Sequence, residues 1–291
     1  MSQRLSQGGR RFVRGLMILL MVSGLPGCTV KLFYGQADWL IPWYVDRQLD
    51  ISGEQKDALK QMVSRQLYWH RDTQVLGYIS TLDAWQQFFS VPFSKEELVS
   101  LNQQTQTHLD VFVRHLLPDL CDFLYSLSPK QRLSIYALIK KSNQAFYEQY
   151  LAEGVDLDRV RFSDSREAVL SWFGSVSKSQ EAAILRLSLT YQPTELETLK
   201  NRKRSLSHLK QILASSSDKE NKTIALRSLL LSPREHWSQG YKRRFDYNAE
   251  VTKVLIEQML KSASPRQQDH MMRRLAKWQK SFRAISKEGT Y

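Results

Sequence analysis

The chain has 291 residues, of which 42% are apolar and seven are tryptophan, and it carries a formal net charge of +13. This length and apolar content predict a folded protein with one large or two small domains and exclude a disordered chain. The charge is uneven, because residues 200–291 carry 21 Lys and Arg against 8 Asp and Glu, whereas residues 28–199 carry 17 against 21.

The first 27 residues have the pattern of a secretory signal peptide. Four arginines precede an apolar stretch at 15–25, "GLMILLMVSGL", which is too short for a transmembrane helix and of the length that signal peptides use. We therefore expect residues 1–27 to be removed, which leaves a mature chain of 264 residues.

The sequence "LPGC" at 25–28 resembles a bacterial lipobox, with Leu25 and Gly27 at the expected places before Cys28 and Pro26 at a less usual one. This resemblance implies cleavage before Cys28 and acylation there, which gives a lasting membrane anchor. Thr29, in place of Asp, favours the outer membrane, facing the periplasm. Cys121 is then the second and last cysteine, so an intramolecular disulfide is excluded and a buried thiol is expected.

A lipidated tether and aromatic junction is expected at 28–50. It contains the segment "DWLIPWYVD", in which Trp39, Trp43 and Tyr44 lie between Asp38 and Asp46. A proline disfavours helix at the residue before it, so Pro42 predicts a bent segment rather than a regular helix. Two interpretations stay open: the rings fasten the tether to the folded body, or they lie at the level of the lipid headgroups.

Helix start signals recur along the chain. Each has an apolar residue, a serine, and Gln or Glu three residues later, which is a capping box, and three of them add proline at the first helical position. The six boxes are Ser52–Gln55, Ser94–Glu97, Ser128–Gln131, Ser177–Gln180, Ser232–Glu235 and Ser264–Gln267. They predict six helix N-termini.

Apolar residues at helical spacing follow these boxes, and strand signals are scarce. We expect an all-α, multi-helix bundle with an N-terminal helical subdomain at 51–155 and a basic C-terminal helical subdomain at 163–291. The breaks are expected at 91–94, 152–164 and 214–221, and the second is the candidate hinge.

Basic residues in the C-terminal half are candidates for binding an anion or an acidic partner. They are Arg202, Lys203, Arg204, Lys242, Arg243, Arg244, Arg273 and Arg274. In the periplasm the partners would be lipid headgroups, an acidic envelope polymer or an envelope protein, so nucleic acid is not expected. A solvated basic face remains the equal alternative.

Residues 68–72, "YWHRD", end the first capped helix. Trp69 is expected to pack inward, and His70 and Arg71 suit the negative end of the helix dipole, with a recognition patch as the alternative. The sequence contains no metal-binding or catalytic motif, so we expect no metal, no catalytic residue and no cofactor apart from the lipid at Cys28.

The lipobox, the segment "LFYGQADWLIPWYVDRQLDISGEQ" at 32–55 and "YWHRD" together resemble an uncharacterised family of proteobacterial lipoproteins. That resemblance implies a helical, membrane-anchored protein and supplies no activity. "LSPKQ" and "ASPRQ" (127–131 and 263–267) are similar to the Leu-Thr-x-x-Gln repeats of periplasmic stress chaperones. The hypotheses are therefore a non-catalytic envelope-binding or scaffold lipoprotein, a lipid-tethered holdase, and an enzyme of an envelope polymer.

Overall fold

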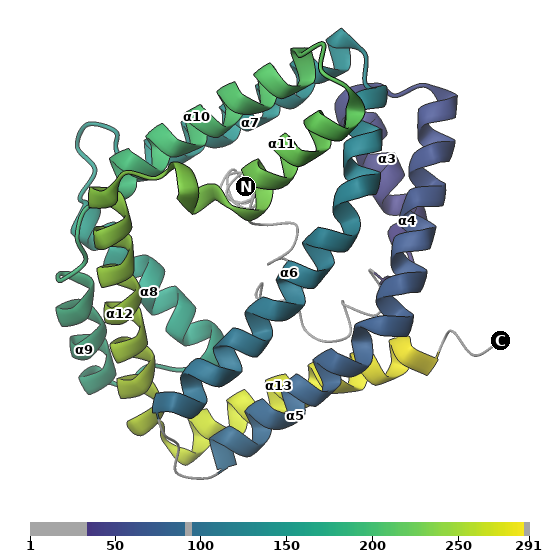
Figure 1. Ribbon diagram of the computed structural model, residues 1–291. Helices are drawn as coiled ribbons and strands as arrows, with labels where there is room; N and C mark the ends of the chain where they lie inside the picture. Colours follow the sequence, from purple (N-terminus) through teal and green to yellow (C-terminus); the bar gives the residue numbers. More distant parts are fainter. Residues whose placement is uncertain (1–33, 91–94, 288–291) are drawn as a thin grey trace. The chain divides into compact units, whose positions relative to one another are not determined.

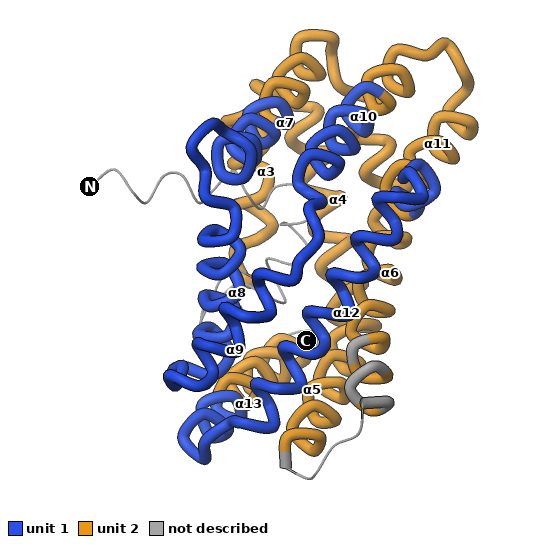
Figure 2. The backbone as a smooth tube through the Cα atoms, turned by 90° about the vertical axis from the view of Figure 1, so that its left-hand side faces the viewer, with its two compact units in different colours: residues 1–16, 139–207, 232–273 blue, residues 17–138, 208–231, 274–291 orange. Residues whose placement is uncertain are grey.

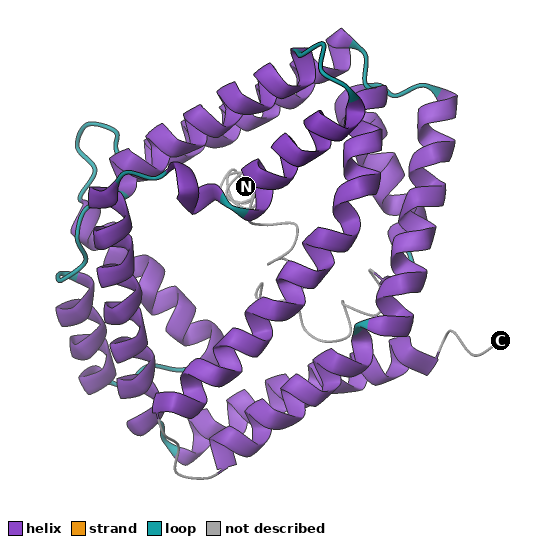
Figure 3. Ribbon diagram, in the orientation of Figure 1, coloured by secondary structure: helices purple, strands orange, loops and turns teal. Residues whose placement is uncertain are grey.

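The computed structural model describes residues 34–90 and 95–287, and over these residues it is all-helical, as expected (Figure 3). Figure 1 shows the helices in chain order. They are α3 (Ala37–Leu49), α4 (Gly53–Thr73), α5 (Val75–Ser90), α6 (Lys95–Ser126), α7 (Pro129–Tyr150), α8 (Leu157–Phe173), α9 (Lys178–Ser188), α10 (Glu195–Ala214), α11 (Lys219–Leu231), the 3-10 helix η2 (Pro233–His236), α12 (Gln239–Lys261) and α13 (Pro265–Lys287).

Two compact units divide the chain, and neither is one continuous segment (Figure 2). Unit 1 contains residues 139–207 and 232–273, whereas the described part of unit 2 contains 34–90, 95–138, 208–231 and 274–287. This division differs from the consecutive subdomains expected at 51–155 and 163–291. The reason is that α7, α10 and α13 are continuous helices that each contribute residues to both units.

Four of the six capping boxes are confirmed, at Ser52, Ser128, Ser177 and Ser264. The break at 91–94 and the cap at Ser94 lie outside the described residues. The box at Ser232 is wrong: its side chain makes no cap and only η2 follows. Six residues later, Ser238 accepts a hydrogen bond from the Tyr241 amide and begins α12 instead.

Two helices begin where a break was expected, because aspartate caps them. Asp156 accepts from the Arg159 amide at 3.0 Å and starts α8 inside the expected hinge at 152–164. Asp218 accepts from the Asn221 amide at 2.8 Å next to the start of α11. Aspartate is as good an N-cap as serine, but without Gln or Glu three residues later it lacks the full box.

The glutamines of the confirmed boxes also join distant helices in pairs, each of which we call a Gln–Gln clasp. In unit 2, Gln55 and Gln131 donate to each other's Oε1 at 3.1 and 2.8 Å. Gln55 Nε2 also donates to the Ser126 carbonyl, and Gln131 Nε2 to the Asp50 carbonyl. Since each Oε1 also accepts from its own box serine amide, both side-chain amides use two donors and two acceptors.

Unit 1 contains a second clasp of the same construction. Gln180 and Gln267 donate to each other at 3.2 and 2.8 Å, and their Nε2 atoms reach the carbonyls of Ser262 and Ser175. In both units, each glutamine therefore reaches the carbonyl that lies five residues before its partner glutamine.

The hairpins that lead into the two clasps also match. α3 and α8 each end at a residue with positive φ, Asp50 at 52° and Gly174 at 73°, and α4 and α9 then begin at a serine capping box. A Cβ on Gly174 would lie 2.6 Å from His270 Nδ1, so this position requires glycine for space as well as for φ. Helix α3 corresponds to α8, and α4 to α9.

The core of unit 2 places α3 against α4. Leu49, Ile51, Leu59, Val63 and Leu127 form one buried cluster, and Ile41 and Val45 of α3 pack against it. The expected bend at Pro42 is wrong, because α3 is helical from Ala37 and Pro42 is buried within it. Burial of the proline ring and of this apolar face offsets the amide that proline lacks.

Candidate functional site

Helix α3 has two different faces. Ala37, Pro42 and Leu49 are buried, whereas Trp39, Trp43 and Tyr44 are exposed by 50%, 46% and 43%. The junction residues of the sequence analysis therefore lie mainly on the surface. Only the buried face of α3 packs against the rest of unit 2.

Polar contacts hold both ends of this junction. At the end of α3, Asp46 pairs with Lys56 of α4 at 2.6 Å, and the hydrogen bond from Lys56 lowers the pKa of the carboxyl. Near its start, Asp38 is exposed and accepts from the Trp39 amide at 2.9 Å. Before the helix, Tyr34 is buried and donates to the Leu67 carbonyl of α4 at 2.7 Å.

A buried chain of hydrogen bonds continues from Tyr34. His70 Nδ1 lies 3.3 Å from the Tyr34 hydroxyl, and its Nε2 lies 3.0 Å from the Tyr78 hydroxyl of α5. Because Tyr34 donates its own proton to Leu67, its oxygen accepts from Nδ1–H of His70. Nε2 then accepts from Tyr78, which assigns the Nδ1–H tautomer to a neutral imidazole.

Burial shifts the acidity of all three groups toward their neutral forms. It lowers the pKa of His70 to about 4 and raises the pKa of Tyr34 to about 12, the latter against the opposing influence of nearby Arg71. Burial also raises the pKa of Tyr78. At neutral pH these three side chains are uncharged, and their ring nitrogens and hydroxyls are hydrogen-bonded to one another. They therefore form a structural joint that connects α4 and α5 with the residues just before α3.

This joint corrects one interpretation of the "YWHRD" motif. His70 lies in the last turn of α4, as expected, but it is neutral and buried and so brings no charge to the helix dipole. Trp69 stacks on His115 of α6, with ring centroids 3.6 Å apart. Arg71 lies over the Tyr34 ring, with Cζ 5.7 Å from its centroid.

Tyr78 and His108 also belong to this cluster, although no sequence motif marks them. His108 lies edge-on to the Tyr78 ring and its Nε2 is 2.8 Å from the Thr81 hydroxyl. Gly77 allows this approach, because a Cβ there would lie 3.1 Å from His108 Cε1. Tyr34, by contrast, belongs to the motif that carried the family resemblance.

The candidate basic residues have different environments. Arg202 faces α7, where it donates to Asn143 and Ser142 at 2.8 Å and lies over the Phe146 ring. Arg204 instead donates to the His236 carbonyl of η2. Two residues of α10 predicted to bind together thus point to different neighbours.

The remaining basic candidates also differ in their contacts and in their exposure. Arg273 pairs with Asp269, and burial lowers the pKa of Arg274, whose guanidinium lies over Trp278. Lys242 and Arg244 are half-buried on α12. Lys203 and Arg243 are exposed, and so are Arg204 and Arg273 beside the partners named above.

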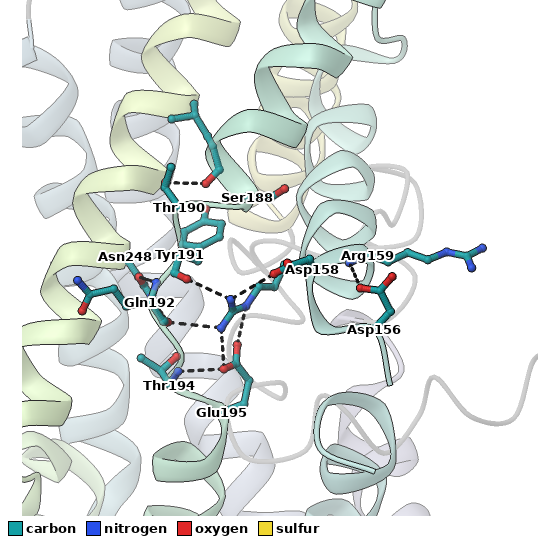
Figure 4. Close-up of polar contacts among 12 residues, drawn as sticks. Asp156, Asp158, Arg159, Ser188, Thr190, Tyr191, Gln192, Thr194, Glu195 and Asn248 are labelled. Atoms are coloured by element: carbon teal, nitrogen blue, oxygen red, sulfur yellow. Dashed lines mark hydrogen bonds and ion pairs between the residues drawn. The ribbon is translucent and has the colours of Figure 1, made fainter. Parts of the chain in front are cut away.

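A partly buried ion pair in unit 1, between Arg161 and Glu195, was not predicted. Figure 4 shows the polar contacts around Glu195. Arg161 of α8 donates through Nε and Nη2 to both oxygens of Glu195, at 3.0 and 2.8 Å. Arg161 also donates to the Tyr191 carbonyl, and Asn248 of α12 exchanges two hydrogen bonds with the backbone of Gln192. These contacts hold the connection between α9 and α10 from both sides.

The model of a family of unknown function, DUF6279, matches residues 47–242, more than half of the chain. The chain belongs to this family. Comparisons with curated proteins and with solved structures found no match. The matched region includes His70, Tyr78 and the unit 2 clasp, whereas Trp39 and Trp43 precede it.

Within residues 34–90 and 95–287, no group of three or more His, Cys, Asp or Glu side chains could hold a metal ion. In the same described part of the chain, none of the helices combines the length and apolarity needed to cross a bilayer. Cys28 and the signal segment 1–27 lie outside the described residues.

Proposed function

We propose that the protein is a lipoprotein anchored through Cys28 in the bacterial outer membrane, where its helical body faces the periplasm and serves as a non-catalytic binding or scaffold component of the envelope. The observation that carries this proposal is the sequence Leu25-Pro-Gly-Cys28 directly after a short apolar segment with a basic N-terminal side. Thr29 supports the outer membrane. Acyl chains on Cys28 would supply the attachment.

The accessible basic residues support an acidic partner in the envelope. Lys203 and Arg243 are exposed on unit 1, within the basic half of the sequence. Such side chains attract phosphate and carboxylate groups in a salt-sensitive way. Arg202, by contrast, serves the packing of α10 on α7.

Replacement of the lipidated residue tests the anchor. We expect Cys28→Ala to abolish incorporation of labelled fatty acid and to leave an unprocessed precursor or a protein released from the membrane fraction. A Cys121→Ala variant is the matched control, because Cys121 is buried and should leave labelling unchanged. Fatty-acid labelling and membrane fractionation that survive in Cys28→Ala would refute the proposal.

A second candidate function is that of a lipid-tethered holdase for unfolded periplasmic clients. It is favoured by large apolar side chains that unit 1 exposes, Leu185, Leu189 and Leu196. We expect the protein to suppress aggregation of an unfolded model client at a near-equimolar ratio. Aggregation at the rate of a buffer control would rule this candidate out.

A further inference from the structure

The outer face of α3 presents tryptophans where a soluble surface helix usually has polar residues. Trp39 and Trp43 are one helical turn apart, on the side away from the buried Ala37, Pro42 and Leu49. Arg47, one turn further, lies with Cζ 5.6 Å from the Trp43 ring centroid. The face therefore combines two amphipathic rings with a cation.

The matching helix of the other unit shows that the hairpin does not need these rings. When α3 and α8 are aligned on their buried last residues, Leu49 and Phe173, the positions of Trp39, Trp43 and Tyr44 correspond to Ser163, Glu167 and Ala168. These three are exposed too. The same hairpin therefore forms with small and polar residues on its outer face, and the tryptophans serve something other than the hairpin.

The position of α3 along the chain indicates what covers this face. Five residues separate Cys28 from Tyr34, and a fully extended chain spans at most about 3.5 Å per residue. Tyr34 therefore lies within about 21 Å of the Cys28 backbone. With acyl chains on Cys28, α3 is confined to the neighbourhood of the headgroup region, where tryptophan is enriched in membrane proteins.

We propose that the outer face of α3 lies on the lipid headgroups, with Trp39 and Trp43 at the boundary between headgroups and acyl chains and Arg47 toward the lipid phosphates. This inference rests on the proposed anchor at Cys28. The lipid holds the chain at the bilayer, and the aromatic face orients unit 2 against it, since Tyr34 and Asp46 fix α3 to α4.

Quenching of tryptophan fluorescence by brominated lipids tests this contact. The native lipoprotein is reconstituted in vesicles of phosphatidylethanolamine and phosphatidylglycerol with brominated acyl chains and compared with Trp39→Ser/Trp43→Glu, which carries the residues of α8. The wild type has seven tryptophans, and we expect the brominated lipids to quench the emission of two of them, Trp39 and Trp43. In the double variant this quenched component should be absent. Trp237→Phe, in unit 1, is the control and should keep the quenched component.

A second preparation separates failure of this inference from failure of the anchor. Coupling Cys28 chemically to a maleimide lipid places the chain at the vesicle whether or not cells lipidate it, and Cys121 is too buried to compete. Equal quenching of wild type and Trp39→Ser/Trp43→Glu on these vesicles would overturn the headgroup contact. A fall in Tm of the double variant in solution, without loss of quenching, would assign the rings to the fold instead.

Discussion

His70 is the residue whose surroundings differ most from the sequence interpretation. The motif "YWHRD" placed it correctly at the end of a helix, but the side chains that contact it come from positions 34 and 78 and from α6. The local sequence predicts where a helix ends, because caps and apolar periodicity act within a few residues. It does not predict which distant side chain contacts the imidazole, so the partnership with Tyr78 could not be predicted.

The shifted pKa of His70 makes stability depend on pH. Because its pKa is about 4 in the folded protein and near 6.5 when unfolded, the unfolded state binds the proton first as pH falls. The contribution of the neutral His70 side chain to the free energy of unfolding is complete above about pH 6.5 and is lost as the pH falls from 6.5 to 4. From urea unfolding at pH 7 and pH 5 we expect the wild type to lose about 2 kcal/mol more than His70→Gln. Equal losses in the two proteins would contradict the neutral, buried histidine.

At the scale of elements, the capping boxes show what sequence can and cannot determine. The boxes at Ser52, Ser128, Ser177 and Ser264 were predicted because their chemistry is local. Ser232 has the same local chemistry, yet Ser238 caps the long helix instead. That the glutamines of the boxes would meet in pairs was beyond prediction, since each pair spans 76 or 87 residues.

The unit 2 clasp can be separated from its caps by one substitution. In Gln131→Glu the carboxylate can still accept from the Ser128 amide, but it cannot donate to Asp50 or to Gln55. We expect a loss of about 1–3 kcal/mol in the free energy of unfolding, because acceptors are left facing one another. Denaturant unfolding measures it, with Gln61→Glu on the exposed side of α4 as the control. Wild-type stability of Gln131→Glu would mean that the clasp contributes nothing.

The partly buried Arg161–Glu195 pair in unit 1 supports a similar prediction. Arg161→Met removes the ion-pair partner of the Glu195 carboxylate, whose side chain is only 13% exposed. We expect a loss of about 3–5 kcal/mol in the free energy of unfolding. The control is Lys261→Met, which removes an exposed partner of Glu257 and should cost less than about 1 kcal/mol. Similar losses in both variants would show that the Arg161 pair is no more than a surface contact.

At the scale of the whole molecule, the all-α class was predictable and the composition of the two units was not. Each helix has apolar residues at helical spacing and most have a start signal, so many independent local features predict the all-α fold class. The units depend on α7, α10 and α13, whose two ends belong to different units. No break in a sequence pattern marks such a division, because the helix continues through it.

The uneven charge of the chain also belongs to this scale. We expect Lys203→Glu/Arg243→Glu to weaken co-purification with envelope components at low salt, and to leave the free energy of unfolding within about 0.5 kcal/mol of the wild type. Arg202→Glu should instead destabilise the fold, because it loses its bonds to Asn143 and Ser142. An unchanged set of partners at every salt concentration would show that these exposed cations serve solubility.

The long sequence separations within the clasps have a consequence for the order of folding. A contact across 76 or 87 residues carries a loop-closure cost that the adjacent helices of the α3–α4 and α8–α9 hairpins avoid. The hairpins should therefore assemble early, whereas a clasp can close only after the intervening helices have brought its two glutamines together. Slow solvent exchange of the four glutamine side-chain amides would then mark molecules in which folding has finished.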